Sequence, residues 1–123
     1  MWRVEYDPIE RVMTLLLAKE VRGVEMRGLA RAHAQALEAT GGQSFRVLAD
    51  LRGMHPLDAE ASAIFSDMKR VAASLPTYRG RAVLVDSPTI AMQQRNATLA
   101  DGGDPLELIT VDAEQARRFA RSS

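Results

Sequence analysis

Strand-like and helix-like runs alternate along most of the chain, and this alternation restricts its fold more than any other feature. Trp2, Val4 and Tyr6 alternate with charged residues, which is the pattern of a half-buried strand. A second strand is predicted at residues 11–18, and its short link to the first favours an antiparallel hairpin. Beyond it, helices are predicted from about 25 to 40, 58 to 75, 88 to 100 and after Asp112, with strands at 45–51, 81–86 and 106–111 between them.

Capping residues support the starts of three of these helices. Asp58 precedes the second helix as an N-cap, and Ser87-Pro88 places a capping hydroxyl before a proline at the first helical position. Asp112 and Gln115 have the spacing of a capping box. Alternating strands and helices form parallel strands joined by right-handed crossovers. The predicted fold is an α/β sandwich with a mixed five-stranded sheet, mostly parallel with an antiparallel first strand, and four helices.

Composition narrows the classes of function. The 123 residues fit one domain over residues 1–123, large enough to bury a core. With no Cys and two His, neither a metal site nor a cofactor is expected. The sixteen basic and sixteen acidic residues leave no net charge to attract nucleic acid. The longest strongly apolar stretch, residues 12–18, is too short to span a membrane, and the first residues lack a signal-peptide pattern, so a cytoplasmic protein is expected.

The segment after the third predicted strand resembles a known family. Asp50-Leu51-Arg52-Gly53 ends that strand, and Asp58-Ala59-Glu60-Ala61 opens the next helix after a short loop. Both tetrapeptides, at this spacing, resemble the strand-to-helix segment of STAS domains, the group of bacterial anti-sigma-factor antagonists and SpoIIAA-like proteins. The order of elements also agrees with that fold along nearly the whole chain. The resemblance implies a regulatory, non-enzymatic domain that binds other proteins.

The chain departs from this family where its members are phosphorylated. The resemblance implies that the switch serine, the substrate of a partner kinase that also binds the sigma factor, corresponds to Glu60, and Ala59 stands at the preceding serine position. Neither residue accepts a phosphate. Glu60 is interpreted either as a mimic of the phosphorylated state or as an ordinary acidic residue that suits the first turn of a helix. Ser62 offers a hydroxyl two residues further on, as a phosphorylation site or as a plain surface residue.

Charged residues gather at the carboxyl ends of the predicted parallel strands, where ligands of open α/β sheets bind. Asp50 and Asp86 end two of these strands, and Arg52, His55 and Ser87 follow them closely. The alternative interpretation is structural: Asp50 pairs with Arg52 or a backbone amide, and Ser87 caps a helix. A hydrolase built on Ser87 and His55 is a remote hypothesis, because the Gly-x-Ser-x-Gly elbow is missing.

Three functional hypotheses follow. The first is a regulatory interaction module whose surface is the loop and helix start containing Asp50, Arg52, Met54, His55, Asp58, Glu60 and Ser62. Its partner would be a regulatory protein, such as a kinase of the anti-sigma type, or a second copy of the chain. The second is a carrier or sensor of small apolar molecules or lipids, with a pocket between sheet and helix near Phe65 and a cleft at Asp86 and Ser87. The third is the hydrolase.

Overall fold

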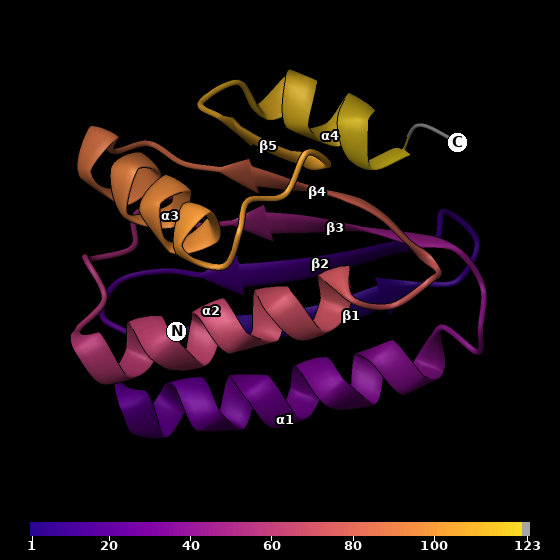
Figure 1. Cartoon of the computed structure of the whole chain (residues 1–123), viewed down its shortest axis with the longest axis horizontal. Coiled ribbons are helices and arrows are strands. Elements are labelled where there is room, and N and C mark those ends of the chain that lie inside the picture. The colour runs from indigo at the N-terminus through magenta and orange to yellow at the C-terminus, as the bar shows by residue number, and fades with distance from the viewer. Residues whose placement is uncertain (122–123) are drawn as a thin grey trace.

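Five strands form one sheet in the order β1-β2-β3-β4-β5, which is also their order along the chain (Figure 1). The computed structural model describes residues 1–121. β1 pairs antiparallel with β2, and the other neighbours pair in parallel, so the mixed sheet predicted from the sequence is confirmed. The strands are β1 (Trp2–Asp7), β2 (Val12–Leu17), β3 (Phe45–Asp50), β4 (Tyr78–Leu84) and β5 (Glu107–Thr110).

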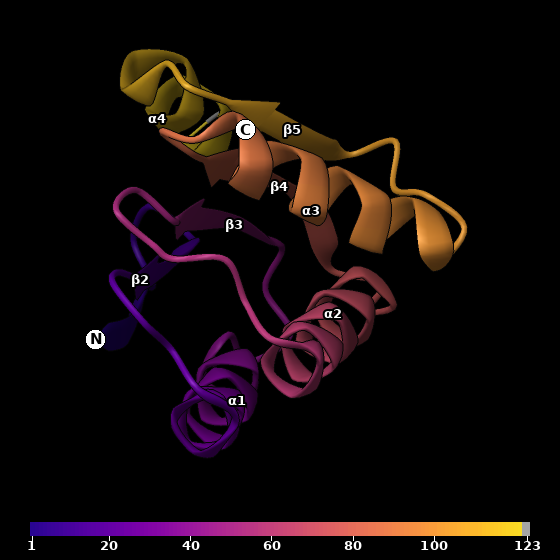
Figure 2. The same cartoon turned by 90° about the vertical axis from the view of Figure 1, so that its left-hand side faces the viewer.

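Helices lie on both faces of this sheet. They are α1 (Gly23–Ala39), α2 (Ala59–Ala73), α3 (Pro88–Ala100) and α4 (Ala113–Arg121). Figure 2 shows α1, α2 and α3 on one side of the sheet and α4 on the other. Each of the first three helices connects two parallel strands, as the alternating pattern predicted. Within residues 1–121, no helix combines the length and the apolar character needed to cross a membrane.

The main core lies between the sheet and the layer of α1, α2 and α3. Alternate residues of β2 and β3 point into it, which is why Met13, Leu17 and Val47 are almost fully buried. From the helices, Met26, Leu29, Phe65 and Ile90 pack against them. Each large apolar side chain buried in this way contributes about 1.5–3 kcal/mol. A smaller cluster fills the space beneath α4 and includes Ala82, Leu84 and Ala116.

The fourth strand starts earlier than its apolar run suggests. It begins at Tyr78, whereas the sequence predicted a start at Arg81. Arg79 and Gly80 interrupt the apolar pattern, and Gly80 has φ of +138°, a conformation that side chains rarely adopt. A Cβ on Gly80 would stand 2.9 Å from the carbonyl oxygen of Leu106 and 3.1 Å from the Phe119 ring. Glycine therefore lets β5 and α4 approach β4 closely.

Candidate functional site

The loop of residues 51–58, between β3 and α2, is tied on one side to the segment that follows β2. The Lys19 amide donates a hydrogen bond of 2.9 Å to the Gly53 carbonyl, and the His55 amide donates one of 2.9 Å to the Lys19 carbonyl. These bonds continue the parallel pairing of β2 and β3 for a short distance past the end of the sheet, where Lys19 bridges to Met54. One side of the loop is thus fixed through its backbone.

The other side of the same loop is held by the segment after β4. The Gly53 amide donates to both carboxylate oxygens of Asp86, at 3.1 and 3.0 Å. Gln93 of α3 exchanges two hydrogen bonds with the backbone of Leu57, accepting at 3.2 Å and donating at 3.1 Å. Gly53 itself has φ of +75°, which a residue with a side chain adopts at a cost. The loop is therefore braced from both neighbouring strand ends.

Asp50 and Arg52 form an ion pair at the base of the loop. The guanidinium of Arg52 donates to the two carboxylate oxygens of Asp50 at 3.0 and 2.8 Å, and the Arg52 amide donates at 3.2 Å. Burial of Asp50 raises the pKa of its carboxyl, but the hydrogen bonds and charge of Arg52 outweigh burial, so that pKa lies below its usual value. The Asp50 carboxylate is ionised and already paired with Arg52, as the structural interpretation predicted.

Asp58 and Glu60 open α2, and each has a partner. The Asp58 carboxylate accepts a 2.8 Å hydrogen bond from the Ala61 amide, so Asp58 is the N-cap that the sequence predicted. Glu60 reaches across to α1 and forms an ion pair with Arg27 while remaining half-exposed. The acidic residue that was predicted to replace a switch serine is thus bonded to a neighbouring helix. Ser62 is partly buried one residue beyond Ala61.

Two residues that the sequence assigned to the site belong to the core instead. Met54 was expected to display its side chain on the loop, but only 4% of it is exposed, because the bridge to Lys19 turns it inward. Phe65 was expected beside a ligand cleft with Asp86 and Ser87, but it is 2% exposed and packed in the main core. The apolar side chains of α2 that would line a lipid pocket, Phe65 and Met68, therefore fill the interior.

Ser87 and His55 are engaged separately. The Ser87 hydroxyl accepts a hydrogen bond of 3.4 Å from the Ile90 amide and caps α3, as predicted. His55 is exposed on the loop, where its backbone is bound to Lys19. Among the hydrogen bonds of residues 1–121, none joins His55 to Ser87. A serine nucleophile needs a base within hydrogen-bond reach of its hydroxyl, and His55 and Ser87 do not form such a pair.

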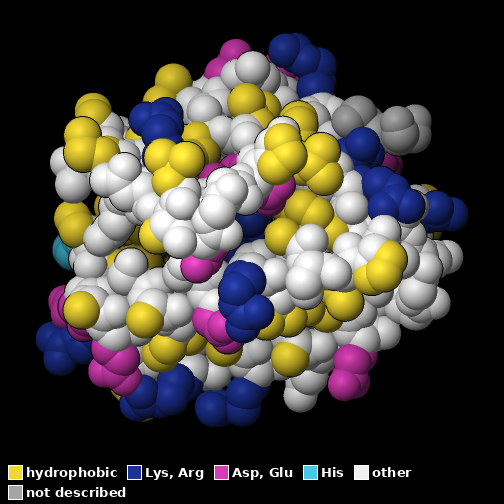
Figure 3. Space-filling view, in the orientation of Figure 1, with side chains coloured by type: hydrophobic (Ala, Val, Ile, Leu, Met, Phe, Trp, Pro, Cys, Tyr) yellow, Lys and Arg dark blue, Asp and Glu magenta, His cyan; other side chains and the backbone are white. Residues whose placement is uncertain are grey.

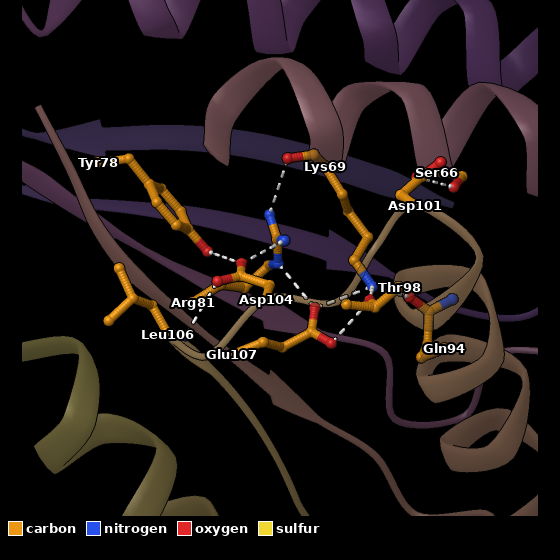
Figure 4. Close-up of polar contacts among 10 residues, drawn as sticks. All are labelled: Ser66, Lys69, Tyr78, Arg81, Gln94, Thr98, Asp101, Asp104, Leu106 and Glu107. Carbon is orange, nitrogen blue, oxygen red and sulfur yellow. Dashed lines mark hydrogen bonds and ion pairs between the residues drawn. The ribbon is translucent and has the colours of Figure 1, made fainter. Parts of the chain in front are cut away.

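The structure contains a buried network of charged residues that was not predicted from the sequence (Figure 4). Lys69 of α2 and Arg81 of β4 both contact the Glu107 carboxylate, at 2.9 and 3.0 Å. All three side chains are less than a tenth exposed. Burial lowers the pKa of Lys69, and the charge of Glu107 offsets part of that shift. The only signal in the sequence was that Lys69 and Arg81 stand at positions of apolar periodicity.

Further bonds saturate this network and extend it to α3 and to Asp104. Lys69 also donates to Gln94 and Thr98 of α3, at 3.1 and 2.7 Å. Asp104 accepts from Arg81 at 3.3 Å and from the Tyr78 hydroxyl at 2.8 Å. A hollow of about 230 Å³ opens above the network, and its lining includes Lys69, Arg81 and Asp104. Since the buried cations and carboxylates neutralise one another, the network holds α2, α3, β4 and β5 together.

The surface over α3 has a different character. Figure 3 shows hydrophobic side chains gathered around α3 and charged side chains along the edge formed by α1. Met92 and Leu99 of α3 are 60% and 63% exposed. They lie seven residues apart, so they share one face of the helix. The helix that carries this apolar face also holds the loop of residues 51–58, because Gln93 of α3 is bonded to the backbone of Leu57.

Comparison with known proteins identifies the fold. No protein-family model and no curated protein matches this chain. A solved structure from Shewanella loihica PV-4, an uncharacterized protein of the DUF3478 family described as having a SpoIIAA-like fold, matches with a TM-score of 0.67. The match covers 98% of this chain and 92% of that one, at 12% sequence identity. At that identity the likeness shows the fold alone: the protein has a SpoIIAA-like fold, as the sequence predicted.

Proposed function

We propose that this protein is a non-enzymatic regulatory module that recognises a partner protein through the loop of residues 51–58 and the first turn of α2. The observation that carries the proposal is the bracing of this loop by Lys19 on one side and by Asp86 and Gln93 on the other. A surface held in its binding conformation loses little entropy when a partner docks, which favours affinity. Recognition residues commonly lie on loops that a scaffold positions in this way.

The hydrogen-bond partners of the polar side chains near the loop support binding over catalysis. Asp50 is bonded to Arg52, Asp86 to the Gly53 amide and Ser87 to the Ile90 amide, so the groups best suited to chemistry maintain the loop. The polar side chains exposed at its surface are those of Arg52, His55, Asp58 and Glu60. They present a mixed pattern of charge, which suits local complementarity with another protein surface.

Glu60 is proposed as a fixed charge that replaces a reversible switch. Its carboxylate lies in the first turn of α2 and pairs with Arg27 of α1, so the negative charge is permanent and held in place. A phosphoserine in the same position would carry more charge and would attract the same guanidinium. The proposed partner is therefore a protein that binds this loop in a single charge state. A kinase of the anti-sigma type is one class of such a partner.

Site-specific photocrosslinking tests the loop as the recognition surface. A photoreactive amino acid replaces Arg52 or His55 in cells of the source organism, and Glu38, exposed at the far end of α1, serves as the control position. We expect one protein to crosslink from both loop positions and not from Glu38. With that protein purified, Arg52→Glu should weaken binding at least about tenfold, and Glu38→Lys should leave it unchanged. Equal binding by both variants would exclude the loop as the recognition surface.

A second experiment addresses the kinase class separately. The Glu60→Ser variant is incubated with ATP and an anti-sigma-type serine kinase encoded near the gene, with the unaltered protein as control. Phosphate transfer to residue 60 of the variant alone would support a kinase partner. Absence of transfer, with loop crosslinking intact, would exclude that class of partner and leave the interaction module standing.

A further inference from the structure

One face of the sheet is covered over only part of its width. α4 packs on β3 and β4, where Ala116 contacts the cluster of Ala82 and Leu84. The strand register places Val12, Thr14 and Leu16 of β2 on this same face, since Thr14 pairs with Leu48 beneath α4. Figure 2 shows α4 beside the β4 and β5 side of the sheet, and none of the helices in residues 1–121 lies over β1 and β2 on this side. We call this uncovered region the open face.

A groove of about 430 Å³ runs along the open face between α4 and β1. Its floor is formed by Val12, Thr14 and Leu48, which are buried or half-buried. α4 therefore stands as a ridge beside a groove, and both features belong to one surface.

The two walls of the groove carry opposite charges. On the side of the β1–β2 hairpin stand the carboxylates of Glu5, Asp7 and Glu10. On the side of α4 stand the guanidinium groups of Arg117 and Arg121, and Arg118 follows on the same helix. These side chains are exposed. Within residues 1–121 no ion pair crosses the groove: Glu5 pairs with Arg3 at 3.2 Å, and Arg117 pairs with Glu114 at 3.3 Å.

We propose that the open face binds the open face of a second copy of this chain about a twofold axis. The α4 ridge of each protomer then lies along the hairpin wall of the other's groove. The arginines of α4 meet the carboxylates of the opposite hairpin, and this contact occurs twice by symmetry. The surface is self-complementary in shape, because it contains a ridge and a groove, and in charge, because one is basic and the other acidic.

Charge complementarity favours a second copy over another occupant. A basic peptide finds opposite charge only on the hairpin, and an acidic peptide finds it only on α4. A second copy brings both an acidic hairpin and a basic α4, so about a twofold axis each hairpin faces the α4 of the partner. α1 and α2 lie on the opposite face of the sheet, so this dimer leaves the first turn of α2 uncovered.

Charge-reversal variants test this interface. One variant carries Glu5→Arg and Glu10→Arg, which makes both walls basic, and the other carries Arg117→Glu and Arg121→Glu, which makes both walls acidic. Asp7 is kept, because its carboxylate accepts hydrogen bonds from the Ile9 and Glu10 amides in the hairpin turn. Sedimentation equilibrium at low ionic strength measures the mass. We expect twice the 13.5 kDa of one chain for the unaltered protein and the mass of one chain for each variant alone.

Mixing the two variants gives the decisive result. In a mixed pair the basic hairpin of one protomer faces the acidic α4 of the other, and the remaining contact joins an acidic hairpin to a basic α4. The mixture should therefore recover the dimer, as one molecule of each variant by native mass spectrometry. The double reversal Arg31→Glu and Glu38→Arg on the far face of α1 is the control and should dimerise normally.

Specific outcomes would overturn the proposal. A monomeric unaltered protein at its highest soluble concentration would do so, as would folded variants that dimerise alone or a mixture that stays monomeric. Circular dichroism establishes that each variant is folded before its mass is interpreted. If the unaltered monomer instead bound another protein through the groove, the second copy would be excluded as its occupant.

Discussion

Glu60 lies against Gly23, so closely that a Cβ on that glycine would overlap the Glu60 carboxyl group. Gly23 is the first residue of α1, and Glu60 is the second residue of α2, so the two helices begin side by side. The carboxylate therefore lies near two helix N-termini, whose dipoles both favour negative charge. Glycine at the start of α1 makes room for it.

We predict that Gly23→Ala displaces the Glu60 side chain and breaks its pairing with Arg27. The obstructing atoms are the end of a flexible side chain, and an alanine suits a helix better than a glycine does, so the free energy of unfolding should change by less than about 1 kcal/mol. NMR chemical shifts of the Glu60 carboxyl and the Arg27 guanidinium report the displacement, and urea denaturation reports the stability.

Gly28→Ala is the matched control for this prediction. It lies in the same helix, and its added Cβ would meet the Trp2 ring at 3.3 Å, away from Glu60. The shifts of Glu60 and Arg27 should remain unchanged in this variant. A Gly23→Ala protein that kept those shifts, or lost several kcal/mol, would show that the glycine is required by the backbone and not by Glu60.

The buried network gives a prediction about stability. Glu107→Gln removes a negative charge that faces both Lys69 and Arg81, and it leaves two buried cations with reduced compensation. Removing one member of such a buried ionic group typically destabilises a protein by about 3–5 kcal/mol. We expect a loss of that size in urea denaturation. Glu114→Gln, whose side chain is 62% exposed, should change the stability by less than about 0.5 kcal/mol. Similar losses in both variants would contradict the role assigned to the network.

The fold followed from local signals in the sequence. Alternation in residues 2–7 and the caps at Asp58 and Ser87 are short-range features, and the structure contains the elements they predicted. The prediction failed where a long-range contact decided the local structure. β4 extends back to Tyr78 because Gly80 accommodates Phe119 of α4, and no local pattern could report a contact with a helix so far along the chain.

The site was only partly predictable for the same reason. Topology places Asp50 and Asp86 at one end of the sheet, and the Asp50–Arg52 pair could be read from residues two apart. Whether Met54 points outward depends on the bridge to Lys19, which joins segments far apart in sequence. The Lys69–Glu107 pair likewise joins α2 to β5, and a charge placed on an apolar stripe was its single local sign.

Asp86 should control the motion of the loop of residues 51–58. Its two carboxylate oxygens accept the Gly53 amide at 3.1 and 3.0 Å, so Asp86→Ala leaves that amide without its acceptor. Losing a hydrogen bond to a charged group corresponds to about 1.5–3 kcal/mol, and the Gly53 amide should exchange with solvent at least about tenfold faster. Asp67→Ala removes an exposed carboxylate on α2 and should leave this rate unchanged. Unchanged exchange in the Asp86 variant would mean that the Lys19 contact alone fixes the loop.

His33 should make the protein less stable in mild acid. The side chain is 3% exposed on the inner face of α1. Burial, assisted by the charge of Arg81, lowers the pKa of His33 to about 4 from the ordinary 6.5. Above pH 6.5 both the folded and the unfolded protein hold a neutral imidazole, and the group contributes nothing to the pH dependence. Between pH 6.5 and 4 the unfolded chain binds the proton alone, so stability falls as the pH falls, by about 3 kcal/mol in all.

Urea denaturation at several pH values between 7 and 4 measures this loss, and His33→Leu isolates it. In the variant the stability should depend less steeply on pH over that window, because one proton no longer binds preferentially to the unfolded chain. His55→Gln, which replaces the exposed histidine of the loop, is the control substitution. If His33→Leu kept that slope as well, the acid sensitivity would have to arise from carboxylates, and His33 would not be held neutral by the fold.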